Sequence, residues 1–164
     1  MATVNNNLSD YDFNSVPSAE NMKIGIMVSE WNNNITTGLL NGAVETLLKH
    51  GISEENILVH HVPGSYELPL SAQLMFETKP VNAVICIGSV IRGETEHFTF
   101  VCEAVTQGCK DVSLKYNKPV VFCVLTDNTE QQGIDRSGGK HGNKGDEAAI
   151  TAIKMIALHR NLAS

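Results

Sequence analysis

Four short apolar runs alternate with amphipathic stretches along the chain, and this alternation restricts the fold more than any other feature. The runs are rich in β-branched residues and apolar at successive positions, a pattern typical of strands buried on both faces. They are KIGIMVS, NILVHHV, VNAVICIGSVI and PVVFCVLT, at residues 23–29, 56–62, 81–91 and 119–126. Such strands, separated by helices, predict a three-layer α/β/α sandwich with a mainly parallel four-stranded sheet.

Helical periodicity fills the intervals between these strands. Apolar residues recur at helical spacing over residues 35–48, and Gly51 stands where a C-terminal cap belongs. Further helices are indicated within residues 63–77, 98–109 and 143–159. Asn143 is a suitable N-terminal cap for the last of them.

The N-terminal part of the chain is less regular. Residues 1–10 are rich in asparagine, and we expect them to form a flexible segment. Residues 11–16, YDFNSV, are expected to add a short edge strand before Pro17 interrupts the backbone pairing. A chain of 164 residues can bury one core without disulfides or metals, so residues 11–164 are expected to form a single domain.

Charge and composition exclude several classes of protein. The net charge is −6 and no basic patch is present, which argues against a nucleic-acid partner, because phosphates require clustered cations. No apolar run reaches about 18 residues, so no membrane span is predicted, and the N-terminus lacks the pattern of a secretory signal. We therefore expect a cytoplasmic protein with reduced, buried cysteines at positions 86, 102, 109 and 123.

Polar segments follow each strand, at the edge where parallel α/β sheets bind their ligands. They are SEWNN, VPGSYE, GSVIRGETEH and LTDNTEQQ. The N–H groups of Gly93, Glu94 and Thr95 would form either an anion site or an ordinary helix cap at the start of the following helix. His97, expected one turn into that helix, is suited to moving protons at neutral pH, although a lone histidine is more often a surface or core residue.

Three further residues are candidates, each with a simpler alternative. Arg136 offers a planar fork for a phosphate, within a glycine-rich stretch that otherwise serves as a flexible connection. Trp31 can stack on a flat ring or pack under its loop, and Glu67 can bind hydroxyl groups or complement a helix dipole. A metal site is not expected, because His60 and His61 are adjacent in a strand and face opposite sides.

Five motifs, in order, resemble those of the lumazine synthases, and the resemblance covers residues 23–158. They are SEWNNNITTGLLNGA, HVPGSYELP, GSVIRGETEHF, PVVFCVLT and RSGGKHGNKG. The resemblance implies a flavodoxin-like fold and the condensation of 5-amino-6-(D-ribitylamino)uracil with 3,4-dihydroxy-2-butanone 4-phosphate. The products would be 6,7-dimethyl-8-ribityllumazine, phosphate and water, in riboflavin biosynthesis and with no cofactor or metal.

The resemblance also implies roles for the motif residues. His97 would be the acid/base, and the phosphate would lie between Glu94, Thr95 and Arg136. The ribitylaminouracil would be held by Trp31, Ser65, Tyr66, Glu67, Ser89, Val90, Ile91 and, from a neighbouring subunit, Phe122. The chain departs from the common family pattern in having Trp31 for Phe and Cys123 for Gly, and neither change alters the implied reaction.

The same resemblance implies a homo-oligomer acting on small molecules. Family members form pentamers with active sites between adjacent subunits, and some assemble into an icosahedral shell. The short connection GGKHGNKG favours the 60-subunit shell over a free pentamer, and association with riboflavin synthase is left open.

Two other functions remain open at this point. One is a non-catalytic carrier or cage for flavin-like ligands on the same fold. The other is a flavodoxin-like FMN-binding module, which the segment SEWNNN after the first strand disfavours, because that segment is not a Ser/Thr/Gly-rich phosphate loop.

Overall fold

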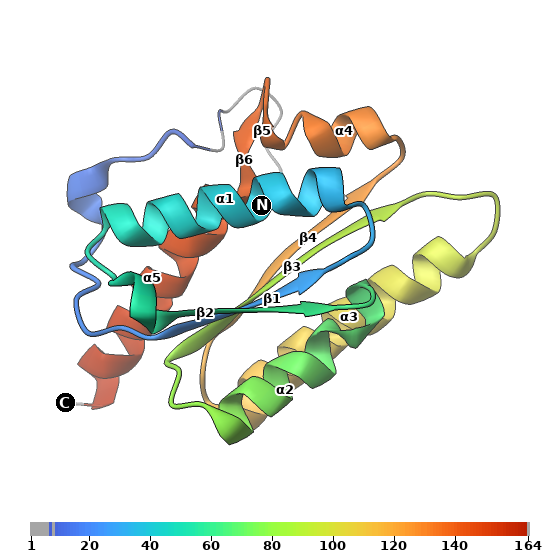
Figure 1. The fold of residues 1–164 in the computed structure, drawn as a ribbon. Helices are drawn as coiled ribbons and strands as arrows, with labels where there is room; N and C mark the ends of the chain where they lie inside the picture. Colours follow the sequence, from blue (N-terminus) through green and yellow to red (C-terminus); the bar gives the residue numbers. More distant parts are fainter. Residues whose placement is uncertain (1–6, 8, 164) are drawn as a thin grey trace.

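The computed structural model describes residues 7 and 9–163, and it confirms the predicted parallel sheet (Figure 1). The four strands are β1 (Ile24–Ser29), β2 (Ile57–Val62), β3 (Ala83–Ile91) and β4 (Val120–Asp127). They lie in the order β2-β1-β3-β4, and each neighbouring pair is parallel. All four strands therefore end at the same edge of the sheet.

Helices cover both faces of this sheet, which makes the predicted three-layer sandwich (Figure 1). On one face lie α1 (Asn33–Lys49) and α5 (Lys144–Ala163). On the other lie α2 (Leu68–Thr78) and α3 (His97–Tyr116). Pro69 falls at the start of α2, where a missing N–H costs nothing, so it does not disturb the helix.

The side chains of the central strands alternate between two hydrophobic cores. Ile85 of β3 is fully buried beneath α1 and α5, in a cluster that includes Leu39. Its neighbour Cys86 faces the opposite way, into a cluster with Leu68 and Val105 beneath α2 and α3. Because both faces of the strand are covered, an apolar residue at every position is what the fold requires.

Helix α1 ends as predicted, at a glycine with a left-handed backbone. Gly51 follows the C-terminal cap residue, His50, with a φ of 92°. The N–H of Gly51 donates to the carbonyl of Leu48 at 3.0 Å. The N–H of Ile52 donates to the carbonyl of Leu47 at 3.2 Å, and the two bonds together form a Schellman motif.

The polar stretch after β4 contains more regular structure than the sequence predicted. A short helix, α4 (Glu130–Ile134), leads to a hairpin of β5 (Ser137–Gly139) and β6 (Gly142–Asn143). The predicted cap of the last helix is confirmed, because the side-chain oxygen of Asn143 accepts the N–H of Gly145 at 2.8 Å.

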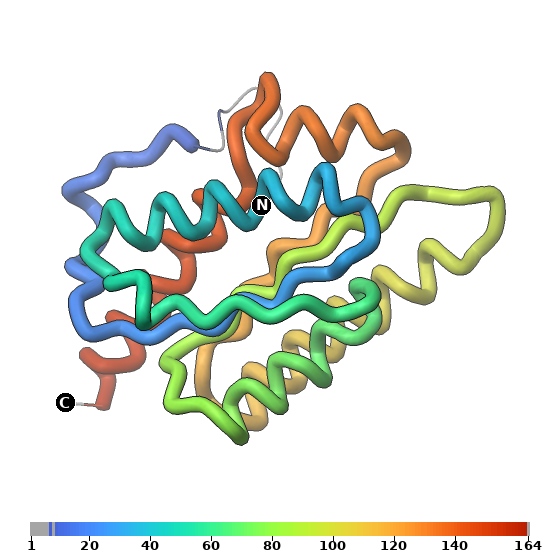
Figure 2. Tube along the Cα trace, in the orientation of Figure 1, coloured from blue at the N-terminus to red at the C-terminus, as the bar shows by residue number. Residues whose placement is uncertain are grey.

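The prediction of an edge strand over residues 11–16 is wrong. This segment forms a 3-10 helix, η1 (Phe13–Ser15), that packs against the end of α1 (Figure 2). The Asp12 carboxylate accepts the N–H of Asn14 at 3.0 Å, a local bond that competes with strand pairing. The ring of Phe13 stacks on His50 with centroids 4.4 Å apart, which fixes the segment on the helix rather than on the sheet.

Two further expectations concern the flexibility of the N-terminal segment and the presence of membrane-spanning helices. The predicted flexible segment, residues 1–10, falls largely on residues 1–6 and 8, outside the described residues. Within the part of the chain that the structure describes, none of the helices combines the length and apolar character that a bilayer span requires.

We expect Gly51→Ala to lower the free energy of unfolding by about 1 kcal/mol, because an added Cβ disfavours the left-handed backbone of the cap. Urea unfolding measures this loss. The control is Asn41→Ala, an exposed position in the middle of the same helix, which should not be destabilised, since alanine is the better helix former. Equal stabilities of Gly51→Ala and the wild type would contradict the role of the cap.

Candidate active site

A cleft of about 610 Å³ opens at the carboxyl ends of β1, β2 and β3. Most of the predicted site residues line it, although they come from four separate segments of the chain. Those residues are Trp31, Ser65, Tyr66, Glu67, Ser89, Val90, Ile91 and His97. The structure therefore brings these eight positions together at one edge of the sheet.

The turn after β1 carries Trp31 into this cleft. The next residue, Asn32, has a left-handed backbone, with φ 56° and ψ 47°, which asparagine tolerates better than other side chains. Its amide donates to the carbonyl of Ser89 at 3.0 Å and so fastens the turn to the end of β3. Trp31 itself is 72% exposed, so its ring is available to a ligand.

The segment after β2 forms a second wall. A 3-10 helix, η3 (Ser65–Glu67), leads directly into α2. Gly64 permits a close approach here, because an added Cβ would lie 3.1 Å from the Glu67 carboxylate and 3.5 Å from the Trp31 ring. The buried hydroxyl of Ser65 has no hydrogen-bond partner among the described residues, although buried polar groups usually have one.

The third wall is the loop between β3 and α3. His97 is the first residue of α3, not one turn into the helix as predicted, and it is exposed. Its N–H donates to the Thr95 hydroxyl at 3.4 Å, a long bond. Glu94 and Thr95 lie on the same exposed loop, beside His97 in sequence, but they are not among the residues that enclose the cleft.

Arg92 connects this loop to the end of β4 through both its backbone and its side chain. Its backbone N–H donates to the carbonyl of Asp127 at 2.9 Å, and its Nε donates to the Asn128 side chain at 3.0 Å. The guanidinium also lies over the Phe98 ring, 4.2 Å from the centroid. The position of the loop that precedes His97 therefore depends on the end of β4.

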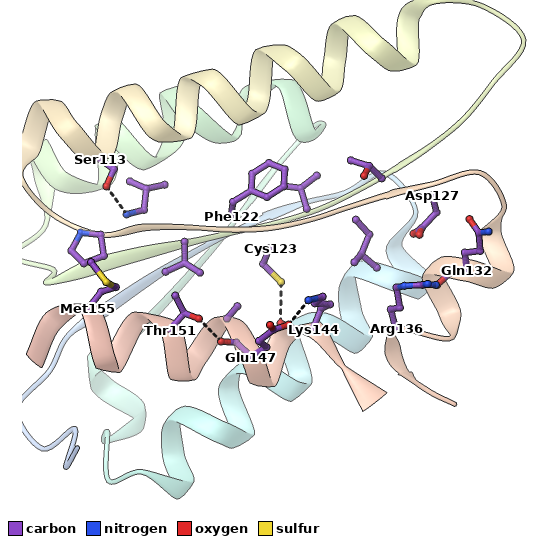
Figure 3. Close-up of a pocket in the computed structure, with 17 residues that line it drawn as sticks. Ser113, Phe122, Cys123, Asp127, Gln132, Arg136, Lys144, Glu147, Thr151 and Met155 are labelled. Atoms are coloured by element: carbon purple, nitrogen blue, oxygen red, sulfur yellow. Dashed lines mark hydrogen bonds and ion pairs between the residues drawn. The ribbon is translucent and has the colours of Figure 1, made fainter. Parts of the chain in front are cut away.

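Two predicted site residues lie elsewhere, in a second cleft of about 690 Å³ along β4 and α5 (Figure 3). Arg136 lies at one end of it, where its Nη1 donates to the carbonyl of Gln132 at 2.8 Å. Phe122 projects from the other side of β4 than Cys123 and is 40% exposed. Within one chain, then, Arg136 and Phe122 share no cleft with His97.

Two ionisable residues in the second cleft have shifted pKa values. Burial raises the pKa of the Cys123 thiol to about 12, so this sulfur is neutral at physiological pH. Burial also raises the pKa of Asp127, and the charge of Arg136 partly offsets that rise. Lys144 forms an ion pair with Glu147, which leaves the middle of the cleft electrically balanced.

Sequence reasoning missed several residues of the two clefts. In the first they are Asn32, Gly64 and Val101, and in the second they include Asp127, Gln132, Lys144 and Glu147. Asn32 lies in a run of three asparagines, and Asp127 directly follows the apolar part of β4, so both had a signal in the sequence. Among the described residues, no three His, Cys, Asp or Glu side chains gather as a metal ion would require.

The chain is similar in sequence to proteins of a known family. Residues 21–160 match the family model of 6,7-dimethyl-8-ribityllumazine synthase. Proteins of that name from Parabacteroides distasonis and Flavobacterium johnsoniae are 58% and 59% identical to the chain, covering 95% and 98% of it and 98% and 84% of their own lengths. The one from Phocaeicola vulgatus is 56% identical, over 99% of the chain and 96% of its own length.

A helix-covered parallel sheet with a polar, aromatic cleft at its carboxyl edge defines an α/β enzyme that acts on small molecules. Within that class, the chain belongs to the 6,7-dimethyl-8-ribityllumazine synthase family, a family of transferases in riboflavin biosynthesis.

We expect Asn32→Ala to lower the free energy of unfolding by about 1–2 kcal/mol, since it strains the left-handed turn and leaves the Ser89 carbonyl unpaired. The fluorescence anisotropy of Trp31, the only tryptophan, should fall as its turn loosens. Asn32→Gly removes the same hydrogen bond without the backbone strain, so it should lose less stability than Asn32→Ala but show the same fall in anisotropy. Unchanged anisotropy in both variants would refute the anchoring role of this amide.

Proposed function

We propose that two neighbouring copies of this chain complete each active site, the first cleft of one subunit facing the second cleft of the next. In the family's reaction, 5-amino-6-(D-ribitylamino)uracil condenses with 3,4-dihydroxy-2-butanone 4-phosphate to give 6,7-dimethyl-8-ribityllumazine, phosphate and water. The observation that carries the proposal is the division of the motif residues between two clefts: His97 lines one, and Arg136 and Phe122 line the other.

The residues of the first cleft suit the ribitylaminouracil. The Trp31 ring would stack on the pyrimidine, and Phe122 of the adjacent subunit would cover its opposite face. Backbone groups at Ser89, Val90 and Ile91 would bind the edge of the uracil. The polyol chain would lie along η3, whose three residues, Ser65, Tyr66 and Glu67, supply hydroxyl and carboxylate groups.

The loop before α3 and Arg136 suit the phosphate of the second substrate. Glu94 and Thr95 would offer backbone N–H groups, which bond to nothing in the described backbone and lie just before the positive end of the helix dipole. Arg136 of the adjacent subunit would clamp the phosphate with its planar fork.

The substrate amine is its own nucleophile, so the protein's part is to bind, orient and move protons. The amine attacks the ketone and an imine forms with loss of water; phosphate is then eliminated, and the second nitrogen closes the ring on the carbonyl of the remaining chain with loss of a second water. His97 would transfer the protons, which is worth about 10²–10⁴ in rate. Holding two substrates in register contributes up to ~7–11 kcal/mol, so positioning dominates.

A ring of subunits also suits the distribution of exposed apolar side chains. Leu70 of α2 and Phe100 of α3 are 61% and 66% exposed on one side of the chain. Phe122 and Met155, at 40% and 44%, line the second cleft. Two different apolar surfaces on one chain are what a head-to-tail ring buries. We propose that the single-domain subunits (residues 11–164) form a cytoplasmic homopentamer, and that the pentamers assemble into a 60-subunit shell. Whether riboflavin synthase associates with this shell is left open.

Incubating the purified protein with both substrates tests the function, because the lumazine product is fluorescent. We expect turnover by the wild type with no added metal or cofactor. Tight binding of the ribitylaminouracil without product would instead support the carrier function, and a yellow flavin spectrum in the purified protein would support the FMN-binding one.

We expect Arg136→Ala to reduce kcat/KM for the phosphorylated ketone at least as much as His97→Ala, since positioning contributes more than proton transfer. For His97→Ala the loss should be about 10²-fold or more. Arg160→Ala and His159→Ala, at exposed positions of α5, are the matched controls and should keep wild-type rates. Near-normal turnover by Arg136→Ala beside an inactive His97→Ala would reject the clamp.

Sedimentation tests the assembly. We expect a particle far larger than five subunits, and Phe122→Glu should shift it toward smaller species, because a charge would be buried in the subunit interface. The control, Leu162→Glu, changes a residue of α5 that is 79% exposed and lines neither cleft. A wild type that sediments as a single pentamer in every buffer would rule out the shell, and a monomer would rule out the composite site.

A further inference from the structure

The last residue of β4 is a buried carboxylate without a role in the proposed reaction. Asp127 is only 7% exposed, and it lines the second cleft. Its Oδ2 atom has no hydrogen-bond partner among the described residues. An added Cβ on Gly133 would lie 3.2 Å from this atom, so the backbone of α4 closes over it. A buried acceptor left in this state requires an explanation.

Arg136 is the cation that interacts with this carboxylate. Both side chains lie at the same end of the cleft, beside Gln132 (Figure 3). The Gln132 carbonyl holds one arm of the guanidinium at 2.8 Å. Burial raises the pKa of Asp127 and the Arg136 charge lowers it, and the net shift is upward. The charge of the guanidinium therefore acts on the carboxylate, although the two side chains form no ion pair within 4 Å.

The other charged groups around Asp127 are engaged elsewhere. From the end of β3, Arg92 donates its backbone N–H to the Asp127 carbonyl, while its guanidinium bonds to Asn128 and stacks on Phe98. From α5, Lys144 pairs with Glu147 in the same cleft. From α4, Glu130 accepts a hydrogen bond from Asn34.

We propose that Asp127 is a positioning residue that weakens the grip of Arg136 on phosphate. This inference rests on the proposed function, in which Arg136 clamps the phosphate of the substrate. A phosphate at the guanidinium brings negative charge up to a buried carboxylate, and two such anions repel each other strongly in a site with little water. Either the anion leaves or Asp127 takes up a proton from solvent. Phosphate released by the reaction is therefore not retained, and anion binding is coupled to protonation of Asp127.

Sulfate is the probe for the test, because it stays a dianion from mildly acidic to neutral pH, so its own charge does not change during the measurement. Its affinity for the assembled protein is measured by calorimetry between about pH 5 and about pH 8. For the wild type, affinity should rise as the pH falls, since protonation of Asp127 removes the repulsion. Asp127→Asn should bind sulfate roughly tenfold more tightly near pH 8, the effect of one like charge in a site of this kind, and its affinity should depend less on pH. Comparing the two proteins cancels the contribution of His97, which both retain.

Two further variants serve as controls. Asp127→Thr also removes the charge, with a β-branched residue suited to a strand, and should match Asp127→Asn. Glu130→Gln removes the same charge from an exposed position on α4 and should bind sulfate as the wild type does. If both Asp127 variants bind sulfate no more tightly than the wild type, with the same pH dependence, the proposal is wrong.

The same experiment separates this inference from the function on which it rests. Arg136→Ala should abolish specific sulfate binding. If the wild type shows no sulfate binding that depends on Arg136, the phosphate clamp itself is wrong, and the role of Asp127 falls with it. If binding depends on Arg136 but not on Asp127, the clamp stands and only the further inference is overturned.

Discussion

The parallel pairing of β1 with β2 and β3 is the constraint on which the rest of the structure depends. In this register Ser29 lies opposite Val62, so the first two strands end together, and β3 continues beyond them to Ile91. The turns that follow the three strands are thereby brought to one edge. The Trp31 turn, η3 and the loop before His97 can form one cleft because the backbone hydrogen bonds of the sheet leave them no other arrangement.

The edge strand β4 divides the functional residues. Successive residues of a strand point to opposite sides, so Phe122 and Cys123 cannot face the same way. Among the described residues no further strand pairs with β4, and a second cleft, which contains Arg136, lies open beside α5. In the proposed active site an adjacent subunit would supply this cleft, so the geometry of a single strand would connect catalysis to assembly.

Charge is distributed unevenly between the two clefts. The first contains one carboxylate and one imidazole, Glu67 and His97, among hydroxyl, aromatic and backbone groups, which suits a polyol and a flat heterocycle. The second contains the ion pair of Lys144 and Glu147 and, at one end, the guanidinium of Arg136 beside the buried carboxylate of Asp127. Arg92 joins the two regions, since the loop beside the first cleft is hydrogen-bonded to the end of β4 at the second.

The sequence alone located the four strands, the glycine cap of α1 and the Asn143 cap of α5. These features depend on residues close together in the chain, so periodicity and capping rules were enough to predict them. The error over residues 11–16 also has a local cause. The Asp12 carboxylate accepts a hydrogen bond from the N–H of Asn14, and this bond outweighed a weak strand pattern. The motifs also named eight of the residues that line the first cleft, but only Arg136 and Phe122 of the second, and neither Asn32 nor Asp127.

Only the tertiary structure decided which of those residues meet. It brought Trp31 into one cleft with Glu67 and His97, and it placed Arg136 and Phe122 in a separate cleft along the edge strand β4. It also left the Asp127 carboxylate buried without a partner. Strand order, the sidedness of β4 and burial arise from contacts between segments distant in sequence. The spacing of residues along a chain does not contain that information, whereas the packing of helices on both faces of the sheet determines it.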